Sequence, residues 1–337
     1  MKVSGMLGAD LDMAPLAIAE LEARGYDAAF SAEINNDPFF PLVLAAEHSE
    51  TIALSTSISV AFARNPMTLA NLAWDLNQYS KGRFTIGLGS QIKQHITRRF
   101  SMPWSQPAAR MREFIAAMRA IWTCWETGEK LDFNGEFYTH NLMTPMFTPS
   151  KKAFGAPGVN LAAVGPLMTE TAAEVADGVI AHGFTTEKYL REVTLPAVER
   201  GLAKSGRSRE DFEVNSPVMV VTGINEEAFE QSRLAVQSQI AFYASTPAYK
   251  PVLEVHGWGD LQAEANQMTR EGRWDEMGKL INDDILNTFA IVSEDIGAVP
   301  DLLSKRYNGL VDNWQCTVET GDREQQQQLV AAVQATA

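Results

Sequence analysis

The chain has 337 residues, of which 45% are hydrophobic and 21% are charged, a composition typical of a soluble globular protein. Its 28 basic and 42 acidic residues give a net charge of −14, which argues against nucleic-acid or membrane partners, since those need basic faces. Two cysteines and five scattered histidines indicate neither a disulfide framework nor a metal site, and the absence of a long apolar run predicts a cytoplasmic protein.

Short β-branched runs alternate with amphipathic stretches along the chain. Eight strands are predicted, over residues 2–6, 27–31, 52–60, 83–88, 159–163, 178–181, 212–221 and 310–316. Nearly every strand is followed by a predicted helix, and the clearest helices cover 66–79 and 107–126. In the second of these, seven large apolar residues from Met111 to Trp125 recur at spacings of three and four and form one wide stripe.

Local signals mark where some of these elements begin and end. Asp12 is expected to cap the first helix, and Gly25 to end it with a left-handed residue. Asn225 is a plausible cap for a helix that begins at Glu226. A small hairpin is expected around Asn134-Gly135, a favoured tight-turn dipeptide.

Eight strands that are nearly all followed by helices predict a parallel α/β protein. Eight such units in this length favour a closed (β/α)8 TIM barrel over an open doubly wound sheet. We expect one domain over residues 1–337. The aromatic-rich stretch from about 237 to 282 is longer than a connection needs, and we interpret it as a helical insertion between strands seven and eight.

In such barrels the chemistry lies at the C-terminal ends of the strands. Two glycine-containing loops follow predicted strands, GLGS at 87–90 and AAVGP at 162–166. The second opens a helix, whose free backbone N–H groups are a candidate phosphate site, although a plain tight turn is an equal alternative. The first is not a dinucleotide fingerprint, because Ile92 stands at the third glycine position.

Charge is distributed unevenly along the chain. Residues 76–112 contain no acidic side chain but seven basic ones. Such a local excess in an acidic protein predicts a surface that meets an anionic ligand tail. Pairing with acidic helices, or a subunit interface, is an equal alternative.

Four motifs in the right order carry a family resemblance. They are AAEHSETIALSTS (45–57), ARNP (63–66), SKGRFTIGLGS (80–90) and AAVGP…AEVADGVI (162–180). Together they resemble the bacterial luciferase-like monooxygenase superfamily, and residues 89–114 are most similar to its coenzyme F420-dependent oxidoreductases. The resemblance implies a (β/α)8 barrel that binds coenzyme F420, a deazaflavin, with FMN as the alternative cofactor.

The resemblance also implies roles for individual residues. Glu33 occupies the place of an acidic residue near the deazaflavin, and Ser57-Ile58 that of a non-proline cis peptide behind its ring. The other cofactor contacts that it implies are Val60, Ser90, Gln91 and His95, with Val164, Gly165, Leu167 and Met168 in the phosphate loop. Ile34 and Ile92 replace the histidine and glutamate of the family's sugar-phosphate dehydrogenases, so that activity is not expected.

The resulting hypothesis is an F420-dependent oxidoreductase that moves a hydride between C5 of the deazaflavin and a small organic substrate. Proton transfer needs a further group, and His95, His182 and Glu33 are the candidates. An FMN-dependent monooxygenase and a cofactor-binding barrel without catalysis are the alternatives. A homodimer is expected, because the family is often dimeric.

Overall fold

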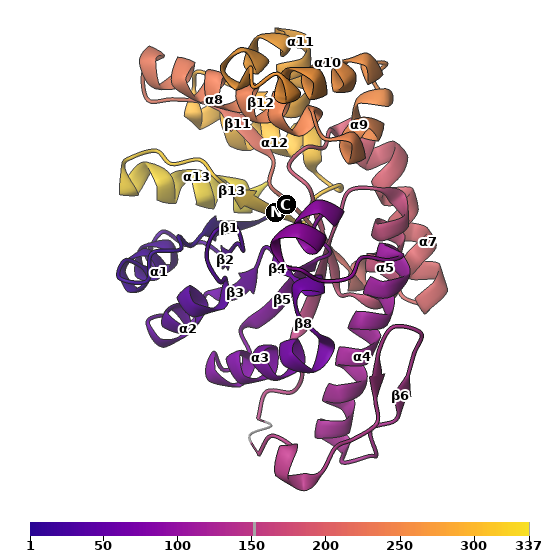
Figure 1. The fold of residues 1–337 in the computed structure, drawn as a ribbon. Helices are drawn as coiled ribbons and strands as arrows, with labels where there is room; N and C mark the ends of the chain where they lie inside the picture. Colours follow the sequence, from indigo (N-terminus) through magenta and orange to yellow (C-terminus); the bar gives the residue numbers. More distant parts are fainter. Residues whose placement is uncertain (151–152, 337) are drawn as a thin grey trace.

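The computed structural model of the chain describes residues 1–150 and 153–336. Eight strands in parallel pairings form a closed barrel (Figure 1), which confirms the predicted TIM barrel. In order around the ring they are β1 (Lys2–Met6), β2 (Ala28–Ser31), β3 (Ala53–Thr56), β5 (Phe84–Gly89), β8 (Gly158–Ala163), β9 (Gly178–Ala181), β10 (Glu213–Ser216) and β13 (Asn313–Cys316). The pairing of β13 with β1 completes the ring.

Helices between the strands cover the barrel from outside (Figure 1). They are α1 (Ala14–Ala23), α2 (Phe39–Glu47), α3 (Pro66–Tyr79), α4 (Pro107–Thr127), α5 (Pro166–Val175), α6 (Glu187–Tyr189), α7 (Leu195–Ser205), α12 (Val299–Tyr307) and α13 (Arg323–Ala335). All seven stripe residues of α4 are buried, as predicted. Within the described ranges, no helix is long and apolar enough to cross a membrane.

The helix caps were predicted with mixed success. Asp12 does not cap α1, which begins after Met13 without a side-chain cap and has a proline in its first turn. Gly25 does follow that helix in the left-handed conformation, with φ of 80°. Asn225 accepts a hydrogen bond from the N–H of Ala228, as expected of a cap. The predicted hairpin is present as β6 (Phe133–Asn134) and β7 (Thr139–His140).

Two predicted strands are in fact interrupted. The strand predicted over 52–60 breaks at a cis peptide bond between Ser57 and Ile58, after which β4 (Ser59–Val60) continues alongside β5. The strand predicted over 212–221 ends at Ser216, because Pro217 has no N–H to continue a ladder. The residues beyond it form β11 (Met219–Val221), which leaves the barrel and pairs with β12 (Ala290–Val292).

A helical segment lies between β11 and β12 and contains the stretch interpreted as an insertion. Its elements are α8 (Glu226–Ala244), the turn Pro247–Tyr249, α9 (Lys250–Glu254), α10 (Gly259–Arg270), the turn Trp274–Leu280 and α11 (Asp283–Phe289). Figure 1 shows these orange helices gathered on one side of the barrel. They enclose a second hydrophobic core, separate from that of the barrel, which includes Ile240, Leu253 and Leu286.

Candidate active site

The break between β3 and β4 lies at the C-terminal mouth of the barrel. The Ser57 hydroxyl accepts a hydrogen bond of 2.9 Å from Nε2 of Gln315, which is buried on β13. Gln315 was not singled out from the sequence, because a glutamine in a predicted strand carries no signal of its own. This hydrogen bond links the first and last thirds of the chain at the segment predicted to bind the cofactor.

Glu33 also holds this segment in place. Its Oε2 accepts hydrogen bonds from the N–H of Val60 at 2.8 Å and from Nη1 of Arg64 at 2.6 Å. Its backbone N–H donates to the carbonyl of Ile58 at 3.1 Å. The Glu33 side chain is only 7% exposed and Arg64 also reaches Asp37, so the three form a largely buried network. These contacts suit a positioning role, and proton transfer by Glu33 stays a prediction.

The glycines of GLGS have a packing role that the sequence did not reveal. A Cβ on Gly87 would lie 1.9 Å from the carbonyl oxygen of Thr56, and one on Gly89 would lie 2.7 Å from Cδ1 of Ile58. Both glycines belong to β5, where their backbones lie close to the interrupted strand. At Gly87 glycine is required because any side chain would push the two backbones apart, whereas at Gly89 it leaves room for the Ile58 side chain.

The AAVGP loop differs, because it borders open space. Gly165 precedes α5 without a side-chain cap, and a Cβ built on it would meet nothing within 4 Å. The Leu167 side chain is 73% exposed in the first turn. Uncapped backbone N–H groups at a helix start favour an anion. This geometry fits the predicted phosphate site.

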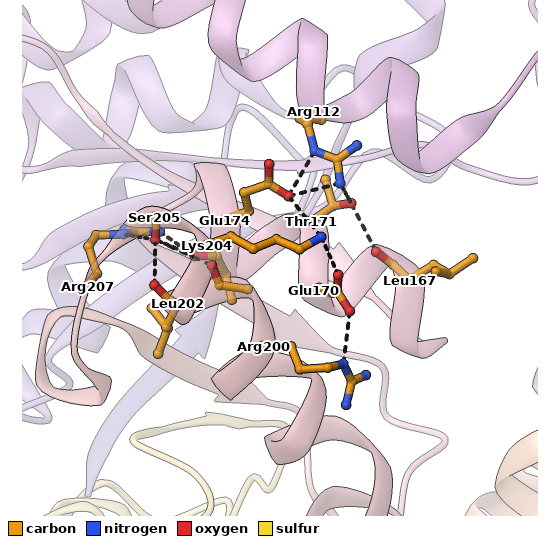
Figure 2. Close-up of polar contacts among 12 residues, drawn as sticks. Arg112, Leu167, Glu170, Thr171, Glu174, Arg200, Leu202, Lys204, Ser205 and Arg207 are labelled. Carbon is orange, nitrogen blue, oxygen red and sulfur yellow. Dashed lines mark hydrogen bonds and ion pairs between the residues drawn. The ribbon is translucent and has the colours of Figure 1, made fainter.

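Ion pairs on both sides hold α5 in position (Figure 2). Arg112 of α4 pairs with Glu174 at 2.9 Å, while Arg200 and Lys204 of α7 pair with Glu170 at 3.0 and 2.6 Å. The helices α5 and α7 also approach very closely at Gly201, where a Cβ would lie 2.2 Å from the Glu170 carbonyl oxygen. The helix that carries the predicted phosphate site is thus fixed by its neighbours.

A cavity of about 520 Å³ opens between the loop after β5 and the inserted helices. Of the predicted cofactor residues, Ser90, Gln91 and Met168 line it. His95 is exposed on the π-helical turn His95–Arg99 that follows this loop. The other predicted residues lie outside the lining, so the cavity and the predicted cofactor positions overlap only in part.

His182 follows β9 and joins the barrel to the insertion. Its ring packs against Tyr243 and Tyr249, with centroids 4.6 and 4.5 Å away. Nδ1 accepts a hydrogen bond from the N–H of Phe184 at 3.0 Å, and Nε2 lies 3.2 Å from the Tyr249 hydroxyl. Burial lowers the pKa of His182 to about 4, so the imidazole is neutral at pH 7 with its proton on Nε2.

The structure narrows the prediction drawn from the basic residues at 76–112. Three of the arginines make contacts that hold the fold together. Arg83 donates to a backbone carbonyl, Arg110 to a backbone carbonyl and the Tyr138 hydroxyl, and Arg112 to Glu174. In the described part of the chain, Lys93 and Arg98 have no carboxylate within ion-pair distance, and both are exposed. Lys81 is likewise exposed, and Arg99 donates to the carbonyl of Ile34; of the seven basic residues, Lys93 alone lines the cavity.

The described residues contain no cluster of histidine, cysteine and acidic side chains that could hold a metal ion. The candidate site is thus framed by a closed barrel and by the uncapped start of α5 at its mouth. The luciferase-like monooxygenase family model matches residues 5–312, and the chain belongs to this family.

Relatives within the family include proteins with and without a known activity. An uncharacterised protein of Mycobacterium tuberculosis is 51% identical over 93% of this chain and 92% of its own length. A 5,10-methylenetetrahydromethanopterin reductase of Archaeoglobus fulgidus is 27% identical over 82% of this chain and 78% of its own.

Solved structures share the fold. The coenzyme F420-dependent tetrahydromethanopterin reductase of Methanopyrus kandleri matches 98% of this chain and 96% of its own, with a TM-score of 0.78 and 22% identity. A Pseudomonas putida monooxygenase in complex with FMN matches 100% and 98%, with a TM-score of 0.65 and 14% identity. At these identities the likeness establishes the fold alone.

Proposed function

We propose that this protein is a coenzyme F420-dependent oxidoreductase that transfers a hydride between C5 of the deazaflavin and a small organic substrate. The observation that carries the proposal is the uncapped start of α5 beside the open space at Gly165, which suits a cofactor phosphate. The relative at 27% identity, a methylenetetrahydromethanopterin reductase, supports reductase chemistry over oxygenation. When bound, the deazaflavin supplies the hydride chemistry, and the protein binds and orients it.

The residues proposed to hold the cofactor fall into two groups. In the phosphate group, the backbone of Val164, Gly165, Leu167 and Met168 offers N–H donors at the start of α5. In the ring group, the segment fixed by Glu33 offers a rigid surface. Its residues are Ser57, Ile58 and Val60, and the neighbouring loop adds Ser90, Gln91 and His95. The rigid surface orients the ring because buried hydrogen bonds at Glu33 and Gln315 fix it.

Of the proposed proton carriers, His95 is the one at the open mouth of the barrel. It is exposed, and its turn follows directly on the cavity-lining residues Ser90–Gln94. His182 is neutral at pH 7, since its pKa is lowered to about 4, and its Nε2 proton faces Tyr249. We therefore assign His95 to proton transfer and His182 to positioning. The homodimer and the cytoplasmic location stay predictions.

Titration with both cofactors tests the proposal. The purified protein is expected to bind F420, followed by the change in its fluorescence, more tightly than FMN. Gly165→Val should weaken F420 binding by at least about tenfold, because the new side chain fills the open space. Thermal unfolding of the variant should stay unchanged, since no heavy atom lies within 4 Å of the new Cβ and the extended backbone of Gly165 accepts a side chain.

Tight FMN binding without F420 binding would overturn the proposal in favour of a flavin monooxygenase. Cofactor binding without turnover of reduced F420 by enones, imines, alcohols or quinones would favour a barrel without catalysis. A His95→Ala variant that binds F420 normally but loses turnover would support the assigned role of that residue.

A further inference from the structure

The lining of the cavity between the barrel and the insertion contrasts with the overall charge of the protein. Its walls come from the loop Ser90–Gln94, the start of α4, Met168 of α5, and the inserted residues Ser245–Ala248, Asn266, Thr269 and Trp274. Lys93 is the only charged residue among them, and none is acidic. The whole chain has 42 acidic and 28 basic residues, so an acid-free cavity is a departure that needs an explanation.

We propose that this cavity binds the substrate and that the substrate is a flat, largely apolar organic acid. The inference rests on the proposed function and names its substrate class. Two features of the lining support it independently: aromatic and proline walls that suit a flat apolar body, and a set of polar groups that suits one negative charge.

The aromatic walls are the indole rings of Trp104 and Trp274, of which the first is packed against the barrel and the second is exposed. Trp104 packs edge-on against the fully buried ring of Phe62, with centroids 5.7 Å apart and an interplanar angle of 76°, so it forms a fixed wall. Trp274 is 52% exposed, and its neighbour Phe242 is 50% exposed. Exposed aromatic area of this kind is stabilised when a flat apolar ligand covers it. Pro107 and Pro247 add further rigid apolar surface.

Two side chains of the lining, Lys93 and Gln91, can donate to a ligand, whereas Ser90, Ser245, Asn266 and Thr269 already donate to backbone carbonyls. Lys93 has no carboxylate partner among the described residues. Gln91 uses its Oε1 to accept from the N–H of Ile92 at 2.9 Å, which leaves its Nε2 free to donate. A carboxylate in the cavity would find these donors, whereas an ammonium group would find Lys93 and no counter-ion.

Two sources of the negative charge have to be separated: the substrate itself, and an acidic group of the cofactor. A matched set of flat probes does this, namely 2-naphthoate, 2-naphthamide and 2-naphthylmethylamine. Their binding is measured by calorimetry and by quenching of tryptophan fluorescence, with and without saturating F420.

We expect 2-naphthoate to bind about fivefold or more tighter than the amide, and the amine to bind most weakly. Lys93→Met should remove the preference for the acid without changing the affinity for the amide, while Lys93→Arg should keep it. Lys130→Met, which removes an exposed lysine in the loop before β6, is the matched control and should change nothing. Trp274→Ala should weaken the binding of all three probes.

Equal affinity for acid and amide, or a preference for the amine, would overturn the inference. So would an unchanged acid preference in Lys93→Met. Competitive displacement of 2-naphthoate by F420 would assign the cavity to the cofactor and likewise overturn it. If the protein binds neither F420 nor FMN while the acid preference persists, the proposed function fails and the cavity remains a site for organic acids.

Discussion

The buried imidazole of His182 should make the stability of this protein depend on pH, and replacing it should remove that dependence. The ring lies between Tyr243 and Tyr249 at the end of β9, and burial lowers its pKa from 6.5 to about 4. The folded protein therefore binds this proton more weakly than the unfolded chain does. The contribution of the neutral imidazole to the free energy of unfolding is therefore complete above about pH 6.5, and it is lost as the pH falls toward about 4.

The magnitude follows from the two pKa values. The full difference between 6.5 and about 4 corresponds to about 3 kcal/mol of unfolding free energy. Between about pH 7.5 and about pH 5.5, residue 182 takes up its proton only in the unfolded chain. Over this range the free energy of unfolding therefore falls by about 1 kcal/mol. The lower limit stays above the isoelectric point of about 4.9, where the protein would carry no net charge.

Urea unfolding of the wild type and of His182→Gln across this range tests the reasoning. At about pH 7.5 the variant should be less stable by about 1 kcal/mol, because its hydrogen bonds to Phe184 and Tyr249 are weaker. Near pH 5.5 this difference should close, since only the wild type pays the protonation penalty. His95→Gln, at an exposed position, is the control. A difference between wild type and His182→Gln that stays constant with pH would refute the argument.

Two further substitutions probe the framework of the site. Gly201→Ala would place a methyl group 2.2 Å from the Glu170 carbonyl oxygen. We therefore expect the free energy of unfolding in urea to fall by about 1–3 kcal/mol and F420 binding to weaken as α5 moves. Unchanged values of both would contradict the close-packing explanation. Arg64→Met leaves the Glu33 carboxylate, 7% exposed, without its cation and should cost about 3–5 kcal/mol in the same unfolding assay. Adding Glu33→Gln should recover part of that loss, and a double variant no more stable than Arg64→Met would argue against the ion pair as the cause.

The barrel could be predicted from the sequence because its signals are local and repeated. The apolar stripe of α4, the left-handed Gly25 and the Asn225 cap each depend on residues within one or two turns of the chain. The candidate phosphate site at Gly165 could be predicted in the same way, since a small residue before a helix start is a property of one short segment. Periodicity and capping therefore determined the fold class, and they predicted one end of the candidate site.

The tertiary structure alone decided how distant segments meet at the mouth. A side chain at Gly87 would clash with the carbonyl oxygen of Thr56, Gln315 binds Ser57 across the closed ring, and the strand predicted through Pro217 divides between two sheets. It also decided which cations bind groups within the fold, as Arg83 does, and which stay exposed beside the cavity, as Lys93 does. These are contacts between residues far apart in sequence, and no local pattern encodes the partner that a side chain meets after the barrel closes.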